Sequence, residues 1–136
     1  MRIAFGSDGS VQDDGVAFDN IKITGLIDQD AGATTLLYPL GECGLTANDS
    51  IVVGLSNLGR DTLNGPFTFN YILNGGTQQS ITVTDQILPN RGIPVVISNV
   101  DLSPPGPYTL KAWPSGIAGD ANNFNDTLEV TIESSP

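Results

Sequence analysis

The feature that most constrains the fold is a regular alternation of apolar and polar residues in short runs. In the run 127–133, the apolar side chains Leu128, Val130 and Ile132 alternate with threonine and glutamate. The run 66–74 has a second such row: Phe67, Phe69, Tyr71 and Leu73. Successive side chains of a strand point to opposite faces of its sheet. The pattern therefore predicts antiparallel strands with one buried face and one face in water.

Turn-forming residues separate these runs at intervals of about ten residues. Asn74-Gly75-Gly76 is the clearest example, because asparagine and glycine tolerate a positive φ. The pattern predicts seven strands, near residues 34–40, 49–57, 66–74, 78–84, 93–100, 107–113 and 127–133. Seven short strands in one domain predict an all-β fold, an immunoglobulin-like Greek-key β-sandwich. The segment 101–108 resembles a tyrosine corner, which places Tyr108 in the core.

Residues 1–27 fall outside this strand count. They hold two apolar stretches, 3–5 and 16–26, joined by an acidic turn, and this predicts an N-terminal β-hairpin. A lone hairpin is marginally stable in water and exposes strand edges, so it needs a sheet to join. We therefore divide the chain into a hairpin at 1–27, a linker at 28–33 and a sandwich at 34–133.

The composition excludes several classes of function. The 136 residues include no histidine and one cysteine, Cys43, which excludes Ser-His-Asp or Cys-His catalysis, imidazole metal sites and an internal disulfide. The formal net charge of -10 argues against nucleic acid and anionic membranes as partners. No apolar run is long enough for membrane insertion. We expect Cys43 to be a small buried hydrophobic residue, the alternative being a disulfide to another chain or segment.

The chain begins without an apolar stretch of signal-peptide length. It is therefore either cytosolic or an internal piece of a longer protein. The low content of charged residues, 15%, with abundant glycine, favours a piece of a secreted bacterial β-protein.

Two stretches carry family resemblances. The string DGVAFDNIKI at 14–23, preceded by GSDGSVQD at 6–13, resembles the closing strands of MAM-like jelly-roll domains. The resemblance implies that residues 1–27 end such a domain and that its acidic residues help to bind a cation. These residues are Asp8, Asp13, Asp14 and Asp19.

The remainder is similar to the immunoglobulin-like adhesion modules of the CARDB kind, which occur in large secreted bacterial proteins. The similarity rests on the order and spacing of five short segments: 53–59, 65–67, 71–75, 106–110 and 120–127. A jelly roll followed by this module is typical of surface proteins of the Bacteroidota. The resemblance implies an extracellular spacer or adhesion module that performs no catalysis.

One loop of the predicted sandwich is rich in oxygen ligands. Asp120, Asn122, Asn123, Asn125 and Asp126 stand together between the last two predicted strands. Carboxylate and amide oxygens are the ligands that calcium prefers. We expect a loop held by hydrogen bonds without any cofactor, the alternative being a calcium site that uses Asp120, Asn122 and Asp126.

Other surface residues suggest binding or modification rather than catalysis. Glu129 and Glu133 lie on the exposed face of a strand, and no pair of carboxylates is identifiable as a glycosidase acid and base. Trp113 is a candidate platform for carbohydrate. Three Asp-Ser/Thr-aliphatic tripeptides predict O-glycosylation at Ser50, Thr62 and Thr127, and Thr62 is favoured because Thr127 starts a strand.

Three functions follow from these observations. The first is a non-catalytic structural or adhesion module, which contacts neighbouring domains or a cell surface. The second is a subunit of a head-to-tail filament, in which residues 1–27 add strands to an identical subunit. The third is a carbohydrate-binding module that recognises glycans through Trp113.

Overall fold

The structure is a computed structural model that describes residues 27–41 and 43–136. Nine strands and their loops make up this part of the chain, with no helix among the described residues. The strands are β1 (Ala31–Tyr38), β2 (Asp49–Asn57), β3 (Leu63–Asn64), β4 (Phe67–Leu73), β5 (Gln79–Val83), β6 (Gln86–Ile87), β7 (Gly92–Val100), β8 (Gly106–Ser115) and β9 (Leu128–Ser134). It follows that no helix in this part of the chain could cross a membrane.

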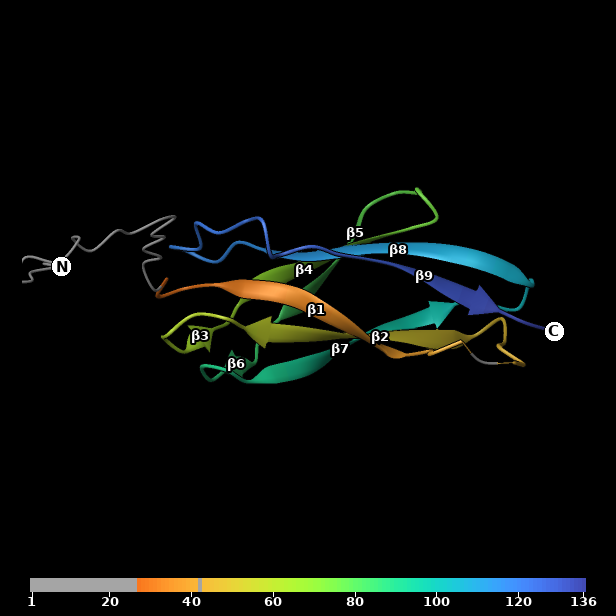
Figure 1. Ribbon diagram of the computed structural model, residues 1–136, viewed down its shortest axis with the longest axis horizontal. Coiled ribbons are helices and arrows are strands. Elements are labelled where there is room, and N and C mark those ends of the chain that lie inside the picture. The colour runs from red at the N-terminus through yellow and green to blue at the C-terminus, as the bar shows by residue number, and fades with distance from the viewer. Residues whose placement is uncertain (1–26, 42) are drawn as a thin grey trace, which may run out of the picture.

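The strands form two sheets that pack face to face (Figure 1). One sheet has the order β1-β2-β7 and the other has the order β5-β4-β8-β9, and all neighbouring strands are antiparallel. The short strands β3 and β6 pair with each other at one end of the sandwich. This arrangement confirms the all-β, immunoglobulin-like sandwich that the alternating pattern predicts.

All seven expected strands are present, with small differences at their ends. The first strand begins at Ala31, three residues before the expected start, because Ala31 and Ala33 are buried against the opposite sheet. The strands β3 and β6 were not expected, since two residues are too few to show an alternation. The predicted N-terminal hairpin lies outside the described residues, apart from Ile27.

The core consists of the inward rows of the two sheets. Ile51, Val53 and Leu55 of β2 are fully buried, as their alternation predicts. They belong to the same apolar cluster as Phe69 of β4 and Leu110 of β8. Burial of each such side chain stabilises the fold by roughly 1.5–3 kcal/mol, so these rows determine how the two sheets pack.

The predicted tyrosine corner is confirmed. Tyr108 is buried near the start of β8, and its hydroxyl donates a hydrogen bond to the carbonyl of Pro104 at 2.8 Å. The bond joins the segment that enters β8 to the strand itself, so it holds the crossing between the sheets.

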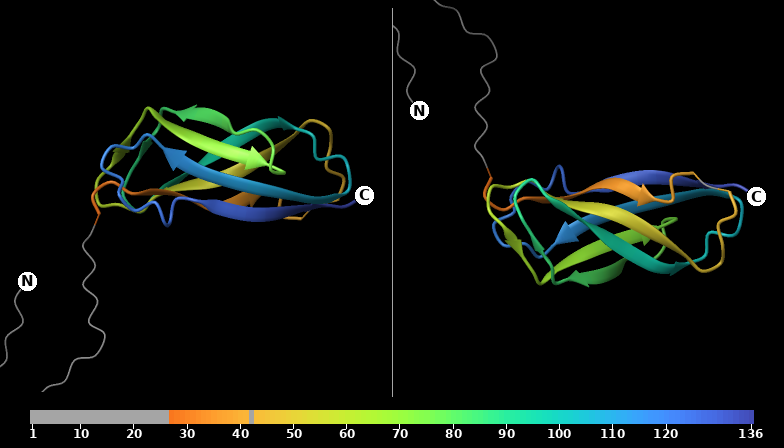
Figure 2. Two further views of the ribbon diagram at one scale, coloured as in Figure 1. Left: turned by 90° about the horizontal axis from the view of Figure 1, so that it is seen from above. Right: turned by 90° about the horizontal axis from the view of Figure 1, so that it is seen from below.

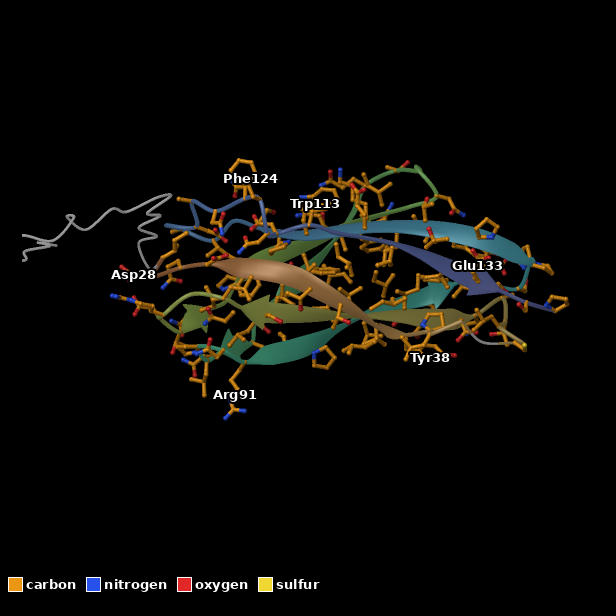
Figure 3. The ribbon with its side chains drawn as sticks, viewed as in Figure 1. Asp28, Tyr38, Arg91, Trp113, Phe124 and Glu133 are labelled. Carbon is orange, nitrogen blue, oxygen red and sulfur yellow. The ribbon has the colours of Figure 1, made fainter. Side chains whose placement is uncertain are left out.

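The sandwich is elongated, and its loops gather at its two ends (Figure 2). Asp28, where the described chain enters β1, lies at one end (Figure 3), and the C-terminus lies at the opposite end (Figure 1). The loop that joins β8 to β9 lies at the same end as Asp28. Residues 28–30 and the β8–β9 loop are therefore neighbours in space although about 90 residues separate them in sequence.

Candidate metal centre

Three aspartates converge at the end of the sandwich where β1 begins. Asp30 immediately precedes β1, Asp120 lies within the β8–β9 loop, and Asp126 lies two residues before β9. One carboxylate oxygen from each lies within 4.8 Å of those of the other two. We refer to this group of Asp30, Asp120 and Asp126 as the aspartate triad.

Backbone contacts hold the β8–β9 loop against β1. The amide of Ala31 donates to Oδ2 of Asp120 at 3.1 Å, and the amide of Ala33 donates to the carbonyl of Asp126 at 2.9 Å. Between them, Gly32 allows the close approach, because a Cβ atom there would lie 2.6 Å from the carbonyl oxygen of Asn125. Gly32 therefore permits the close contact between β1 and the β8–β9 loop that places the three aspartates together.

The β2–β3 loop fixes Asp30 from the other side. The carbonyl of Asp30 accepts hydrogen bonds from the amides of Leu58 and Gly59, at 2.8 and 3.2 Å. The loop is itself organised by Asn57, which is 1% exposed and whose Nδ2 donates to two backbone carbonyls while its Oδ1 accepts from Gly59. The backbone that carries the Asp30 side chain is thus bound to a rigid part of the fold.

Two asparagines of the β8–β9 loop surround the triad. Nδ2 of Asn125 donates to both carboxylate oxygens of Asp30 at 3.1 Å, and Nδ2 of Asn122 donates to one of them at 3.4 Å. In contrast, Oδ1 of Asn125 and Oδ1 of Asp126 are buried and lack a hydrogen-bond partner within the described part of the chain. Buried oxygens without partners are rare and costly, so these two atoms point to a missing ligand.

Electrostatics make the triad unfavourable by itself. Asp30 and Asp126 are 5% and 7% exposed. Burial raises the pKa of Asp126 to about 6, and repulsion by Asp120 and Asp30 adds to the effect. Among the described residues, no ion pair to a member of the triad is found: Arg60 pairs with Asp28, and Lys111 pairs with Glu129. Clustered carboxylates that are buried without a cation cost free energy.

The donor set suits a hard divalent cation. Carboxylate and amide oxygens are the ligands of Ca²⁺ and Mg²⁺, whereas softer metals prefer imidazole or thiolate. The triad offers three carboxylates, and Oδ1 of Asn125 belongs to the amide whose Nδ2 contacts both carboxylate oxygens of Asp30. A bound cation would both neutralise the carboxylates and supply a partner for the orphaned oxygens.

A hollow of about 320 Å³ opens beside the triad. Asp120 and Asp126 line it, whereas Asp30 is not part of its wall. Trp113 of β8 forms another part of the wall, together with Ile117, Asn123 and Thr127. Two members of the triad therefore border the hollow, whereas Asp30 is buried and does not.

The structure brings together the predicted residues of the β8–β9 loop. Asp120 and Asp126 belong to the triad, while Asn122 contacts it by donating to Asp30 and to Oδ1 of Asp120. Asp30 was not predicted, because the sequence places it in the linker at 28–33. Its only signal was its acidic character, and its position directly before β1 became visible only with the observed start of that strand at Ala31. The other predicted cation ligands, Asp8, Asp13, Asp14 and Asp19, lie outside the described residues.

The remaining predicted sites are distributed over the surface. Ser50 is half-buried within β2, Thr62 is half-buried in the β2–β3 loop, and Thr127 is exposed directly before β9. Glycosylation at these positions stays a prediction. The expectation of a buried Cys43 is wrong: its side chain is exposed, since the residue lies in the loop between β1 and β2 and not in an inward row of either sheet. Its backbone pairs with Ser135 in an isolated bridge.

Comparison with solved structures shows the fold. The chain is similar to the CARDB domain of a Pyrococcus furiosus protein, whose crystal structure was solved in complex with di-metal ions. The TM-score is 0.58 at 14% identity, over 88% of this chain and 100% of that one. A domain of a "putative cell surface protein" from Methanosarcina acetivorans gives a TM-score of 0.62 at 15% identity, over 80% of this chain and 94% of that one.

A solution structure of the same Pyrococcus domain gives a TM-score of 0.55 at 15% identity, over 82% of this chain and 97% of that one. No protein-family model matches the chain, and no curated protein matches it. The similarity to CARDB domains therefore shows a shared fold. The expected MAM-like jelly roll and the Bacteroidota origin are not confirmed by these comparisons.

Proposed function

We propose that this chain is a non-catalytic module of an extracellular or cell-surface protein, and that a calcium ion holds together the end at which the chain enters the sandwich. The observation that carries the proposal is Oδ1 of Asp126. This carboxylate oxygen is buried and lacks a hydrogen-bond partner among the described residues, and its carboxylate lies within a triad of like charges.

The shape of the sandwich supports a role as a structural module. Asp28 and the C-terminus lie at opposite ends of the elongated fold (Figures 1 and 3). Such a module extends a chain of domains in one direction, since the segments before and after it leave from opposite ends. The fold that it shares with a domain of a surface protein is in keeping with this role.

The side chains available also favour a non-catalytic role. The chain contains no histidine, and Glu129 and Glu133 point to solvent from the exposed face of β9. The aspartates that do gather are placed to hold a cation rather than to exchange protons with a substrate. The di-metal complex of the similar Pyrococcus domain shows that this fold accommodates metal ions in that protein.

Calcium would join two segments of the chain that are distant in sequence. Asp30 belongs to the segment that enters β1, while Asp120 and Asp126 belong to the β8–β9 loop. Binding of the ion to both would stabilise the folded state relative to the unfolded chain, in which no such site exists. The ion would also stiffen the end of the sandwich that faces the preceding part of the chain.

The test is thermal unfolding of the 136-residue chain in calcium and in EDTA. At a calcium concentration about one hundred times the Kd, binding stabilises the fold by about 2.7 kcal/mol, which corresponds to a rise in Tm of roughly 10 °C for a domain of this size. Replacing Asp120 with Asn should remove most of this rise. Asp85 provides the matched control, because Asp85→Asn removes the same charge at an exposed position that is not part of the triad. An unchanged Tm in millimolar calcium would refute the proposal.

A further inference from the structure

We infer that the calcium ion of the aspartate triad binds a neutral saccharide through two neighbouring hydroxyl groups, with Trp113 as the wall against which the sugar ring packs. The inference rests on the proposed calcium site and names its ligand. Asp120, Asp126 and Trp113 line one and the same hollow, because Trp113 lies near the end of β8, directly before the loop that carries the two aspartates. Cation ligands and an aromatic face are thus presented to one bound molecule.

The triad leaves part of the coordination sphere of calcium for an external ligand. Calcium takes about six to eight oxygen ligands. Three carboxylates binding through one oxygen each, with Oδ1 of Asn125, would supply four of these. About two to four positions then remain, and the hollow bordered by Asp120 and Asp126 is the space from which an external ligand would reach them. Two adjacent hydroxyls of a sugar have the spacing to replace two water molecules on one calcium ion.

The backbone of Trp113 is held in place before any ligand arrives. It stands opposite Asn70 in the pairing of β4 with β8, and Nδ2 of Asn70 donates to the Trp113 carbonyl at 3.4 Å. Asn70 is 4% exposed, and its Oδ1 accepts hydrogen bonds from Gln78 and Ser80. The backbone that carries the indole is therefore part of a satisfied network. Since an indole has only two χ angles, it loses little conformational entropy when a ligand packs on it.

The charge of the protein favours a neutral ligand. The chain has a formal net charge of -10, and three carboxylates around one Ca²⁺ still leave a single negative charge. An anionic peptide or an acidic polysaccharide would be repelled by both. Hydroxyl groups bind calcium without bringing further charge.

The volume of the hollow also fits a small ligand. At about 320 Å³ it lies at the lower end of the range for small-ligand sites and suits one sugar residue.

The test uses the fluorescence of Trp113, which is the single tryptophan of the chain. The probes are methyl α-mannopyranoside and methyl β-galactopyranoside, which present neighbouring hydroxyls in two different orientations. We expect at least one of them to shift the emission of Trp113 in calcium, with a Kd in the millimolar range, and the affinity to fall by at least about tenfold in EDTA. The fully O-methylated mannoside has no free hydroxyl and should cause no shift.

Two variants separate the sugar site from the calcium site. Trp113→Ala should abolish sugar binding, measured by calorimetry, and should leave the rise in Tm with calcium intact. Phe124→Ala is the matched aromatic control, because Phe124 is fully exposed and outside the hollow (Figure 3); it should bind sugar as the unmodified chain does.

The outcomes distinguish failure of this inference from failure of the proposed function. A rise in Tm with calcium but no response to either sugar would overturn the saccharide inference and leave the calcium site standing. Sugar binding of equal strength in EDTA would also overturn it, because the ion would then take no part. If calcium raises neither Tm nor sugar affinity, both proposals fail.

Discussion

Replacing Asp126 with Asn should stabilise the fold in the absence of calcium and destabilise it in the presence of calcium. The two side chains have nearly the same shape, so the substitution removes a charge and little else. Without calcium, the carboxylate of Asp126 is buried beside two other carboxylates. The variant should therefore be more stable than the unmodified chain in EDTA, which is unusual for a change at a buried polar residue.

The magnitude follows from the pKa of Asp126. Its rise from 3.8 to about 6 corresponds to roughly 3 kcal/mol at neutral pH, since each pKa unit is about 1.4 kcal/mol. Because the pKa is raised in the folded state, the folded protein binds the proton more tightly than the unfolded chain does. The contribution of Asp126 to the free energy of unfolding of the ion-free chain should thus fall when the pH rises from about 4 to about 6.

The assay is urea unfolding at several pH values, in EDTA and in excess calcium. At pH 7 in EDTA, we expect Asp126→Asn to be about 2–3 kcal/mol more stable than the unmodified chain. Its stability should also lack the decrease between pH 4 and 6. In calcium the order should reverse, since the loss of a charged ligand weakens binding of the ion.

The control is Asp85→Asn, which should change stability by less than about 0.5 kcal/mol under all these conditions. A lower stability of Asp126→Asn than of the unmodified chain in EDTA would contradict this prediction. That result would mean that the carboxylate is already compensated in the ion-free protein.

Three further substitutions test how the fold supports the triad. Gly32→Ala should weaken calcium binding about tenfold or more in a calorimetric titration, because the new Cβ would displace the backbone at Asn125; unchanged affinity would show that the close contact is unimportant. Asn57→Ala should lower the free energy of unfolding in urea by roughly 2–4 kcal/mol, since it leaves buried backbone groups without partners, and a loss below 1 kcal/mol would contradict that role. Tyr108→Phe should cost about 1 kcal/mol in the same measurement, because the corner hydrogen bond is lost; no loss would show that this bond adds nothing.

The fold was predictable because its signals are local. The alternation in β2, β4 and β9 depends on neighbouring residues only, and it correctly placed rows such as Ile51, Val53 and Leu55 in the core. The tyrosine corner was equally visible, since the hydroxyl of Tyr108 binds a carbonyl only four residues away. Strands β3 and β6 were missed because two residues carry no period.

The candidate site was predictable only in part, because it is assembled from distant segments. Asp120 and Asp126 stand close together in sequence, so their loop attracted attention as an oxygen-rich cluster. Asp30 lies about 90 residues away and joins them only through the way β1 packs beside the β8–β9 loop. Such juxtapositions arise from the topology of the sheets and leave no periodic signal. Trp113, in contrast, lies near the end of the strand that leads into this loop, so its place beside Asp120 is a local feature.

The most direct test of the account is a crystal structure of the chain grown with calcium, with the ion located by its anomalous scattering. We predict one calcium peak within the triad, about 2.3–2.6 Å from a carboxylate oxygen of each of Asp30, Asp120 and Asp126. Ligand positions on the side of Trp113 should be filled by water or by an added sugar. A triad without calcium at a saturating concentration, with Oδ1 of Asp126 bonded only to water or to protein, would contradict it.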